Sequence, residues 1–222
     1  MSPSRAAPDP TAAARQLLAR LAGSQPDHDP AHLRLGAGLA QGCDELLRPH
    51  FPAEPRPAAV LIGLVAREAG PSILLTVRAT HLRHHAGQIA FPGGRMEASD
   101  ADPAATALRE AQEEIGLAPE HVQVVGYLPD HLILTGYRVT PVVAHVAPGF
   151  ALRFDPAEVQ ETFELPWLQL LDPAHHVAYR RRLLDTEVDA RDILCGQHRI
   201  WGATAGMLFC LRELALSQGP AS

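Results

Sequence analysis

Continuous apolar runs of strand length begin near residue 58 and recur along the rest of the chain. Two of them, residues 59–65 and 72–77, flank residues 68–71, whose glycine and proline are typical of a turn. This region is therefore predicted to form a β-hairpin. Further apolar runs predict strands over residues 122–127, 133–146 and 180–194.

Helical periodicity is clearest over residues 103–117. Asp102 and Pro103 suit the start of a helix, Gly116 suits its end, and five apolar residues between them share one face: Ala104, Ala107, Leu108, Ala111 and Ile115. Residues 155–163 are predicted to form a short helix and residues 202–216 a mostly buried one. Because strands and helices are mixed without a regular βαβ repeat, we predict an α+β fold or an α/β/α sandwich, with a mixed sheet between helices.

The N-terminal quarter of the chain is rich in proline and lacks the apolar runs of strand length found in the rest. We interpret residues 1–57 as an extension with a proline-rich linker, residues 58–216 as the main domain and residues 217–222 as a tail. Within the extension, the pattern predicts a helix that starts at Thr11 and a weaker one over residues 33–47. The first helix has an apolar stripe that must be buried on the domain or on a partner subunit, which leaves a homodimer open: Leu17, Leu18 and Leu21.

Composition and charge narrow the class of protein. Of the 222 residues, 46% are apolar and 20% are charged, which is typical of a folded globular chain. Nineteen basic and 25 acidic residues give a net charge of −6, which argues against a nucleic-acid partner. The three cysteines are far apart and no apolar stretch is long enough to span a bilayer, so we expect a soluble cytoplasmic protein with no membrane partner.

The helix over residues 103–117 also carries an acidic face. It consists of three glutamates at spacing i, i+3 and i+4, whose carboxylates repel one another: Glu110, Glu113 and Glu114. Mg²⁺ or Mn²⁺, which prefer oxygen ligands, would relieve this repulsion, and the alternative is an ordinary solvated acidic face. Arg109 lies one turn before Glu113 and is placed to hold its carboxylate. Gly93 and Gly94, shortly before the helix, would let the backbone approach an ion or a phosphate closely.

Gly94 together with residues 109–117 resembles the Nudix box, usually written G-x5-E-x7-R-E-U-x-E-E-x-G-U with U apolar. Every fixed position of its second half matches. The first half is one residue longer than the pattern, so its isolated glutamate corresponds to Glu97 or to Asp100. The resemblance implies a Nudix fold and a metal site formed by the helix glutamates and a backbone carbonyl: Glu110, Glu113, Glu114 and Gly94.

Residues 74–94 resemble a second pattern at every fixed position, the signature of the coenzyme A pyrophosphatase branch of the Nudix family, L-L-T-x-R-(S/A)-x3-R-x3-G-x3-F-P-G-G. Residues 158–166 and 200–205 look like that branch too. The segment around the signature is rich in basic side chains although the whole chain is net negative, which suits an anionic substrate. The residues that the resemblance implies in substrate binding are Arg78, Arg83, Gly87, Gly93 and Arg95.

The resemblance implies a metal-dependent enzyme that hydrolyses coenzyme A, or its derivatives, to 3′,5′-ADP and 4′-phosphopantetheine with Mg²⁺ or Mn²⁺. Arg109 and a general base would be the catalytic residues. Glu113 is favoured as the base within the box and Glu161 outside it, with Glu164 and Glu97 behind them. Two alternatives stay open, a Nudix hydrolase of another nucleotide derivative such as ADP-ribose and a non-catalytic Nudix module that senses a ligand.

Overall fold

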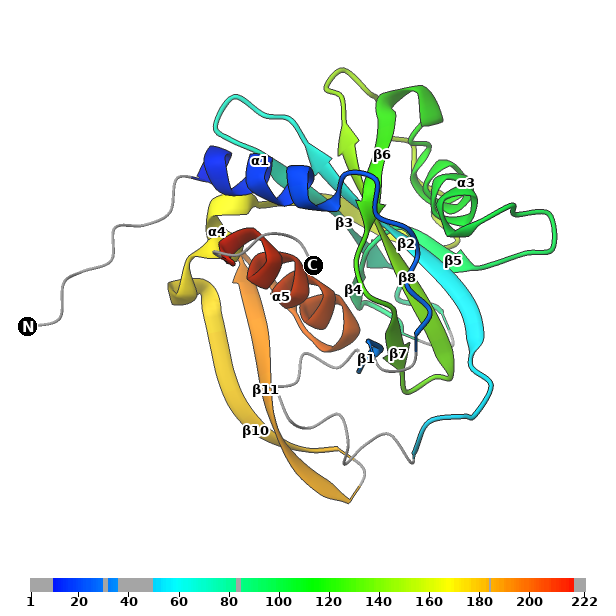
Figure 1. Cartoon of the computed structure of the whole chain (residues 1–222), viewed down its shortest axis with the longest axis vertical. Coiled ribbons are helices and arrows are strands. Elements are labelled where there is room, and N and C mark those ends of the chain that lie inside the picture. Colours follow the sequence, from blue (N-terminus) through cyan, green and yellow to red (C-terminus); the bar gives the residue numbers. More distant parts are fainter. Residues whose placement is uncertain (1–9, 30–31, 36–49, 83–84, 184, 218–222) are drawn as a thin grey trace, which may run out of the picture.

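The computed structural model describes residues 10–29, 32–35, 50–82, 85–183 and 185–217. Within these residues, a mixed sheet of nine strands lies at the centre, in the order β1-β7-β8-β2-β3-β4, with β5 on β2, β6 on β8 and β9 on β3 (Figure 1). Strands β2 and β8 are parallel, whereas β3, β5 and β6 join the sheet in antiparallel pairs. The strands are β1 (Arg34–Leu35), β2 (Arg56–Val65), β3 (Ser72–Arg78), β4 (Ile89–Ala90), β5 (Gly93–Arg95), β6 (Val122–Tyr127), β7 (His131–Ile133), β8 (Tyr137–Val146) and β9 (Val159–Pro166).

A second sheet of three antiparallel strands lies beside the first. It is formed by β10 (His176–Leu183), β11 (Thr186–Cys195) and β12 (His198–Ile200). Strands β10 and β11 make a long hairpin that extends from the body of the molecule (Figure 1). The strand-rich character predicted for residues 180–194 is confirmed in this hairpin.

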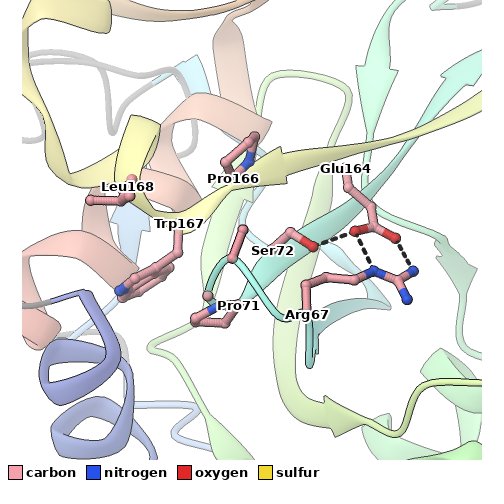
Figure 2. A pocket seen from close by; sticks show the side chains of 9 residues that line it. Arg67, Pro71, Ser72, Glu164, Pro166, Trp167 and Leu168 are labelled. Atoms are coloured by element: carbon pink, nitrogen blue, oxygen red, sulfur yellow. Dashed lines mark hydrogen bonds and ion pairs between the residues drawn. The ribbon is translucent and has the colours of Figure 1, made fainter.

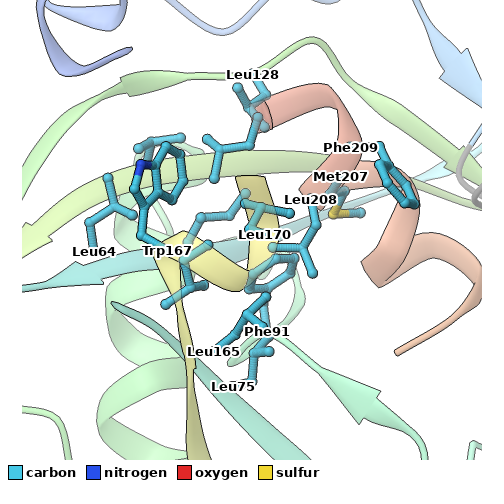
Figure 3. Packing of buried hydrophobic residues seen from close by; sticks show 14 of the residues in the cluster. Leu64, Leu75, Phe91, Leu128, Leu165, Trp167, Leu170, Met207, Leu208 and Phe209 are labelled. Atoms are coloured by element: carbon cyan, nitrogen blue, oxygen red, sulfur yellow. The ribbon is translucent and has the colours of Figure 1, made fainter. Parts of the chain in front are cut away.

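Helices cover both faces of the main sheet. Helix α3 (Pro103–Ile115) lies on one face, and α1 (Pro10–Leu21), α4 (Trp167–Leu171) and α5 (Gly202–Leu216) lie on the other. Strand β2 shows the two cores directly, because Leu61 packs in the cluster under α3 and its neighbour Ile62 in the cluster under α5. Figure 3 shows Trp167 and other side chains of the second cluster. The predicted α/β/α sandwich with a mixed sheet is therefore confirmed.

Most predicted elements are confirmed, including the β2–β3 hairpin, α3 with its caps and α5. The run over residues 133–146 is divided by a turn at Gly136 into β7 and β8. The helix predicted over residues 155–163 is wrong, because from Val159 the segment is strand β9, paired along β3. Of the weak helix predicted over residues 33–47, residues 34–35 form a strand and residues 36–47 lie outside the described residues.

The apolar stripe of α1 is buried on the domain of its own chain. Leu17 is fully buried and Leu21 almost so, in the same cluster as α4, α5 and the sheet. The segment after the helix is attached as well, since the Tyr127 amide of β6 donates to Ser24 Oγ at 2.9 Å. The boundary at residue 57 stays a prediction, but α1 shares the core of the main domain. No helix among the described residues has both the length and the apolar character to cross a membrane.

We expect Leu17→Ala to lower the free energy of unfolding by about 3 kcal/mol, because it removes a fully buried side chain and leaves a cavity between α1 and α5. Urea unfolding followed by circular dichroism measures this change. Gln16→Ala, at the exposed neighbouring position, is the control and should change stability by less than about 0.5 kcal/mol. Equal midpoints for the two variants would mean that α1 is not packed on the domain in solution.

Candidate active site

One guanidinium group organises the acidic face of α3. Arg109 donates from one nitrogen to Glu110 Oε1 at 2.9 Å and to Glu113 Oε2 at 3.0 Å. Its other nitrogens donate to both carboxylate oxygens of Asp100 at 3.0 Å and to the Arg95 carbonyl at 3.2 Å. These contacts hold the pKa of the Asp100 carboxyl well below its usual range and raise the pKa of Arg109. Arg109 therefore ties β5, the following loop and α3 into one unit.

In the loop between β5 and α3, Asp100 is the acid that contacts Arg109. Asp100 accepts hydrogen bonds from Arg109, from the Glu97 amide at 2.8 Å and from the Thr106 hydroxyl at 2.9 Å. Asp102 caps α3 by accepting from the Ala105 amide, as its position before Pro103 predicts. Of the two acids open for the isolated position of the Nudix box, Asp100 is the one that Arg109 contacts.

Glu110 and Glu114 converge on the backbone of Gly93 and Gly94. The Gly93 amide donates to Glu114 Oε2 at 3.1 Å, and Arg78 lies 3.8 Å from Glu114 Oε1. A Cβ at Gly94 would lie 2.5 Å from Glu110 Oε1, so any larger residue there would displace this carboxylate from its position. Burial raises the pKa of Glu114 to about 7 and also raises the pKa of Glu110.

This arrangement fits a divalent cation. Two carboxyl groups whose ionised forms are disfavoured by burial face a glycine backbone, and a cation would restore their charged state. Glu113 is more exposed and points to Arg109. Among the side chains that the structure describes, no ready-made group of three His, Cys, Asp or Glu ligands is present. Glu110, Glu114 and the Gly94 carbonyl are the groups best placed to hold the ion.

A loop glutamate that we did not select from the sequence lies near this site. After burial, which is the main cause, the charge of Glu158 also raises the pKa of both Glu110 and Glu114. The Glu158 carbonyl accepts from the Ala79 amide at 2.8 Å, which anchors the loop beside the end of β3. The only sequence signal was its place in the segment 158–166, which resembles the coenzyme A branch.

The structure does not bring Glu161 together with the carboxylates of α3. Glu161 pairs with Val77, whose side chain packs in the cluster on the α5 face of the sheet. Its carboxylate lies 3.5 Å from His198 Nε2 of β12, and the His198 ring stacks on Phe163. A register shift between Val77 and Arg78 changes the alternation at this point, so Glu158 and Glu161 have different surroundings.

Glu164 is occupied by a separate ion pair. Arg67 donates to its two carboxylate oxygens at 3.0 and 2.5 Å, and the Ser72 hydroxyl donates to it as well (Figure 2). This pairing lowers the pKa of Glu164. Glu164 lies five residues further along β9 than Val159, which pairs with Arg78, and five strand residues correspond to about 16 Å. Glu164 lines a separate, small cavity of about 190 Å³. These contacts give Glu164 a structural role, because they attach the β2–β3 turn to β9.

A larger cavity of about 440 Å³ opens beside β5, on the side of the main sheet that α5 covers, and no residue of α3 lines it. Of the residues predicted to bind substrate, Arg78, Gly93 and Arg95 line it together with Gly94. Gly87 does not line it, and its amide instead donates to the Arg78 carbonyl at a turn with φ of 68°. Arg83 lies outside the described residues. The lining residues that the structure describes include three arginines and a histidine but no carboxylate: Arg78, Arg95, Arg181 and His85.

The family of the chain follows from comparison with known proteins. The family model of the NUDIX domain matches residues 55–186. The chain belongs to the Nudix hydrolases, enzymes that act on pyrophosphate bonds and generally use divalent metal cations.

Among its relatives is the uncharacterised Nudix hydrolase NudL of Shigella flexneri serotype 5b, 44% identical over 181 residues that cover 79% of this chain and 91% of that protein. NudL of Escherichia coli strain K12 is 43% identical over the same shares. Among solved structures, a MutT/Nudix family protein from Enterococcus faecalis has a TM-score of 0.48 and 18% identity over 82% of this chain and 73% of that chain. The Nudix hydrolase RenU from M. smegmatis has a TM-score of 0.44 and 26% identity over 50% and 71%.

We expect Glu114→Gln to stabilise the metal-free protein increasingly as the pH rises from about 5 to about 8. The pKa of Glu114 is about 7 in the folded chain and has its ordinary value of 4.5 in the unfolded chain, so the stability contributed by the protonated form is lost as pH rises through 7. Glutamine does not ionise, and the gain over wild type should approach about 2 kcal/mol at the higher pH.

Urea unfolding in the presence of EDTA at the two pH values measures this difference. Glu120→Gln, which changes an exposed glutamate outside α3, is the control and should show no pH-dependent difference from wild type. A stability difference for Glu114→Gln that is the same at both pH values would show that Glu114 is already ionised in the folded protein near pH 5.

Proposed function

We propose that this chain is a metal-dependent pyrophosphatase that hydrolyses coenzyme A to 3′,5′-ADP and 4′-phosphopantetheine. The observation that carries the proposal is the cavity of about 440 Å³ beside β5, whose described lining residues include three arginines and no carboxylate, and one of these arginines, Arg78, lies 3.8 Å from Glu114 of the acidic helix. A substrate with several phosphates suits this basic wall, while its phosphoanhydride faces the carboxylates of α3. The likeness of residues 74–94 to the coenzyme A signature supports the same substrate.

We assign Glu110, Glu114 and the Gly94 carbonyl to a Mg²⁺ or Mn²⁺ ion, with Glu113 as a further ligand. When bound, the cation supplies neutralisation of phosphate charge and orientation of the attacking water. Arg109 is a positioning residue, because its guanidinium holds Glu110 and Glu113 at fixed places relative to β5. Arg78 and Arg95 bind the phosphate oxygens, and Gly93 lets the substrate approach the backbone.

A carboxylate must accept the proton of the attacking water. Glu113 and Glu161 are the bases that we predict from the sequence. We favour Glu158 over Glu161, because the Glu158 carbonyl is hydrogen-bonded to Ala79 just after β3, whose Arg78 lies 3.8 Å from Glu114, whereas the Glu161 carboxylate lies 3.5 Å from His198. Exposure of Glu158 to solvent also keeps its carboxylate available to water.

The substrate assignment is tested by incubating the protein with coenzyme A and Mg²⁺ or Mn²⁺ and identifying the products by mass spectrometry. We expect 3′,5′-ADP and 4′-phosphopantetheine, no turnover in EDTA, and a loss of at least about 100-fold in kcat for Glu114→Gln. Glu120→Gln, which changes an exposed glutamate that lies outside α3 and does not line the cavity, serves as the matched control and should keep the wild-type rate. Faster hydrolysis of ADP-ribose or of nucleoside triphosphates than of coenzyme A would assign the enzyme to another Nudix substrate.

The base is tested by comparing Glu158→Gln, Glu161→Gln and Glu113→Gln. We expect Glu158→Gln to lower kcat by about 100-fold or more, to abolish the acidic limb of the pH–rate profile and to leave metal affinity nearly unchanged. A loss confined to Glu161→Gln or Glu113→Gln, with Glu158→Gln active, would assign the proton transfer to that residue instead. Circular dichroism of each variant shows whether the fold is retained.

A further inference from the structure

The wall of the large cavity is shared between the two sheets. The main sheet contributes Gly93 and Gly94 of β5, and the β10–β11 hairpin contributes Leu183 near its tip. Trp201, which follows directly after β12 at the base of this hairpin, lines the cavity as well. It belongs to residues 200–205, the segment that resembles the coenzyme A branch and that has no part in the proposed chemistry.

The backbone on both sides of Trp201 is held in place. Ile200 is fully buried and pairs with β11. After Trp201, the Thr204 hydroxyl donates to the Ile89 carbonyl of β4 at 2.9 Å. Gly202, between these two anchors, has a φ of 64°, a left-handed conformation that favours glycine. The place of Trp201 at the cavity is therefore fixed by its neighbours in the sequence.

The Trp201 side chain is exposed at this wall. Its exposed fraction is 42%, whereas the second tryptophan of the chain, Trp167, is 1% exposed within the core. In the part of the chain that the structure describes, no aromatic ring stacks on the Trp201 indole and no guanidinium group lies over it. Contact of so large an apolar surface with water is unfavourable, and a flat aromatic face at a cavity is suited to a planar ligand group.

Trp201 lies near the arginine that connects the cavity with the acidic helix. Ile89, whose carbonyl accepts from Thr204, pairs with β3 at the residue before Arg78. Arg78 in turn lies 3.8 Å from Glu114. Because Trp201 precedes Thr204 by three residues, about 5 Å along a helix axis, Trp201 and Arg78 line the same part of the cavity.

This position suits the base of a nucleotide. In coenzyme A a single ribose separates adenine from the cleaved phosphoanhydride, whereas the thiol end of the pantetheine arm is much farther from it. An aromatic face close to Arg78, which binds phosphate in the proposed function, is therefore placed for the base. The half-buried Gln88 lines the cavity beside Ile89, and its Oε1 accepts from His85 Nδ1 at 2.8 Å. This orientation leaves the Gln88 amide nitrogen to donate to ring nitrogens of a purine.

We propose that the Trp201 indole stacks on the adenine ring of the substrate. The inference rests on the proposed function and deepens it, because coenzyme A carries an adenosine directly beside the anhydride that is cleaved. Trp201 is then the residue through which the enzyme recognises the nucleoside half of its substrate, while Arg78 and Arg95 bind the phosphates.

Calorimetry tests this contact without turnover, with 3′,5′-ADP, which contains the base, and with 4′-phosphopantetheine, which does not. We expect Trp201→Ala to weaken binding of 3′,5′-ADP about 5- to 100-fold, the range for a base stacked on an aromatic ring, and to leave binding of 4′-phosphopantetheine unchanged. Trp201→Phe keeps a smaller ring and should lose less. Leu168→Ala is the matched control, because Leu168 is a similarly exposed apolar residue, at 49%, that lines the separate small cavity, and it should keep both affinities.

Tryptophan fluorescence gives a second measurement of the same contact. Since Trp167 is buried in the core, only the emission of Trp201 should respond to a bound nucleotide. We expect 3′,5′-ADP to quench the emission of wild type and of Leu168→Ala, and Trp201→Phe to abolish the response. A merely structural role of Trp201 would produce no such quenching, so a wild-type emission that does not change at saturating 3′,5′-ADP overturns the proposal.

Other outcomes would also overturn the proposal. Unchanged affinity of Trp201→Ala for 3′,5′-ADP is one, and a loss confined to 4′-phosphopantetheine, which would place the pantetheine arm on the indole, is another. Light scattering tests a second copy of the chain as the occupant, and a wild-type dimer that Trp201→Ala dissociates would overturn the base site too.

The binding data also separate this proposal from the proposed function. If the enzyme does not hydrolyse coenzyme A but binds 3′,5′-ADP through Trp201, the proposed function fails and the base site stands. If the enzyme hydrolyses coenzyme A and Trp201→Ala binds 3′,5′-ADP as wild type does, the proposed function stands and the base site fails.

Discussion

The hydrogen bonds of Arg109 are the constraint on which the active-site region depends. A single guanidinium joins the Arg95 carbonyl at the end of β5, Asp100 in the loop and two glutamates of α3. Without this cation, the acidic loop and the acidic helix would repel each other along their whole contact. Arg109 makes no hydrogen bond to Glu114, and burial raises the pKa of Glu114, so a positive charge at this carboxyl group would favour its ionised form.

Local signals made the acidic helix predictable. Asp102, Pro103 and Gly116 fix its ends, and its apolar stripe fixes the buried face, so the positions of the three glutamates followed from the sequence. The contact between Arg109 and Glu113 was predictable as well, because residues four positions apart on a helix lie side by side. The choice of Asp100 over Glu97 depended on how the loop folds back on the helix, which spacing alone does not determine.

Features that depend on strand register could not be predicted in this way. Glu158 and Glu161 are three residues apart, and only the irregular pairing of β9 with β3 separates their surroundings. The same holds for Arg180, Arg181 and Arg182 of β10, of which only Arg181 lines the cavity, because the face on which each lies depends on the pairing of a second sheet. The burial of Leu17 depends on which distant helices lie beside α1, so the sequence alone left both the domain and a partner subunit open as its place of burial.

The division of the cavity wall between two sheets has a consequence for how the protein can change. The end beside Gly93 and Gly94 tolerates little change in sequence, because a Cβ at Gly93 would lie 2.6 Å from the Val60 Cα. The opposite end is contributed by a hairpin whose strands pair with each other and with β12, outside the hydrogen-bond ladder that supports α3. A substitution in that hairpin can therefore change its part of the cavity wall while the backbone around Gly93 and Gly94 keeps its geometry, so the two parts of the wall are free to evolve, or to be engineered, independently.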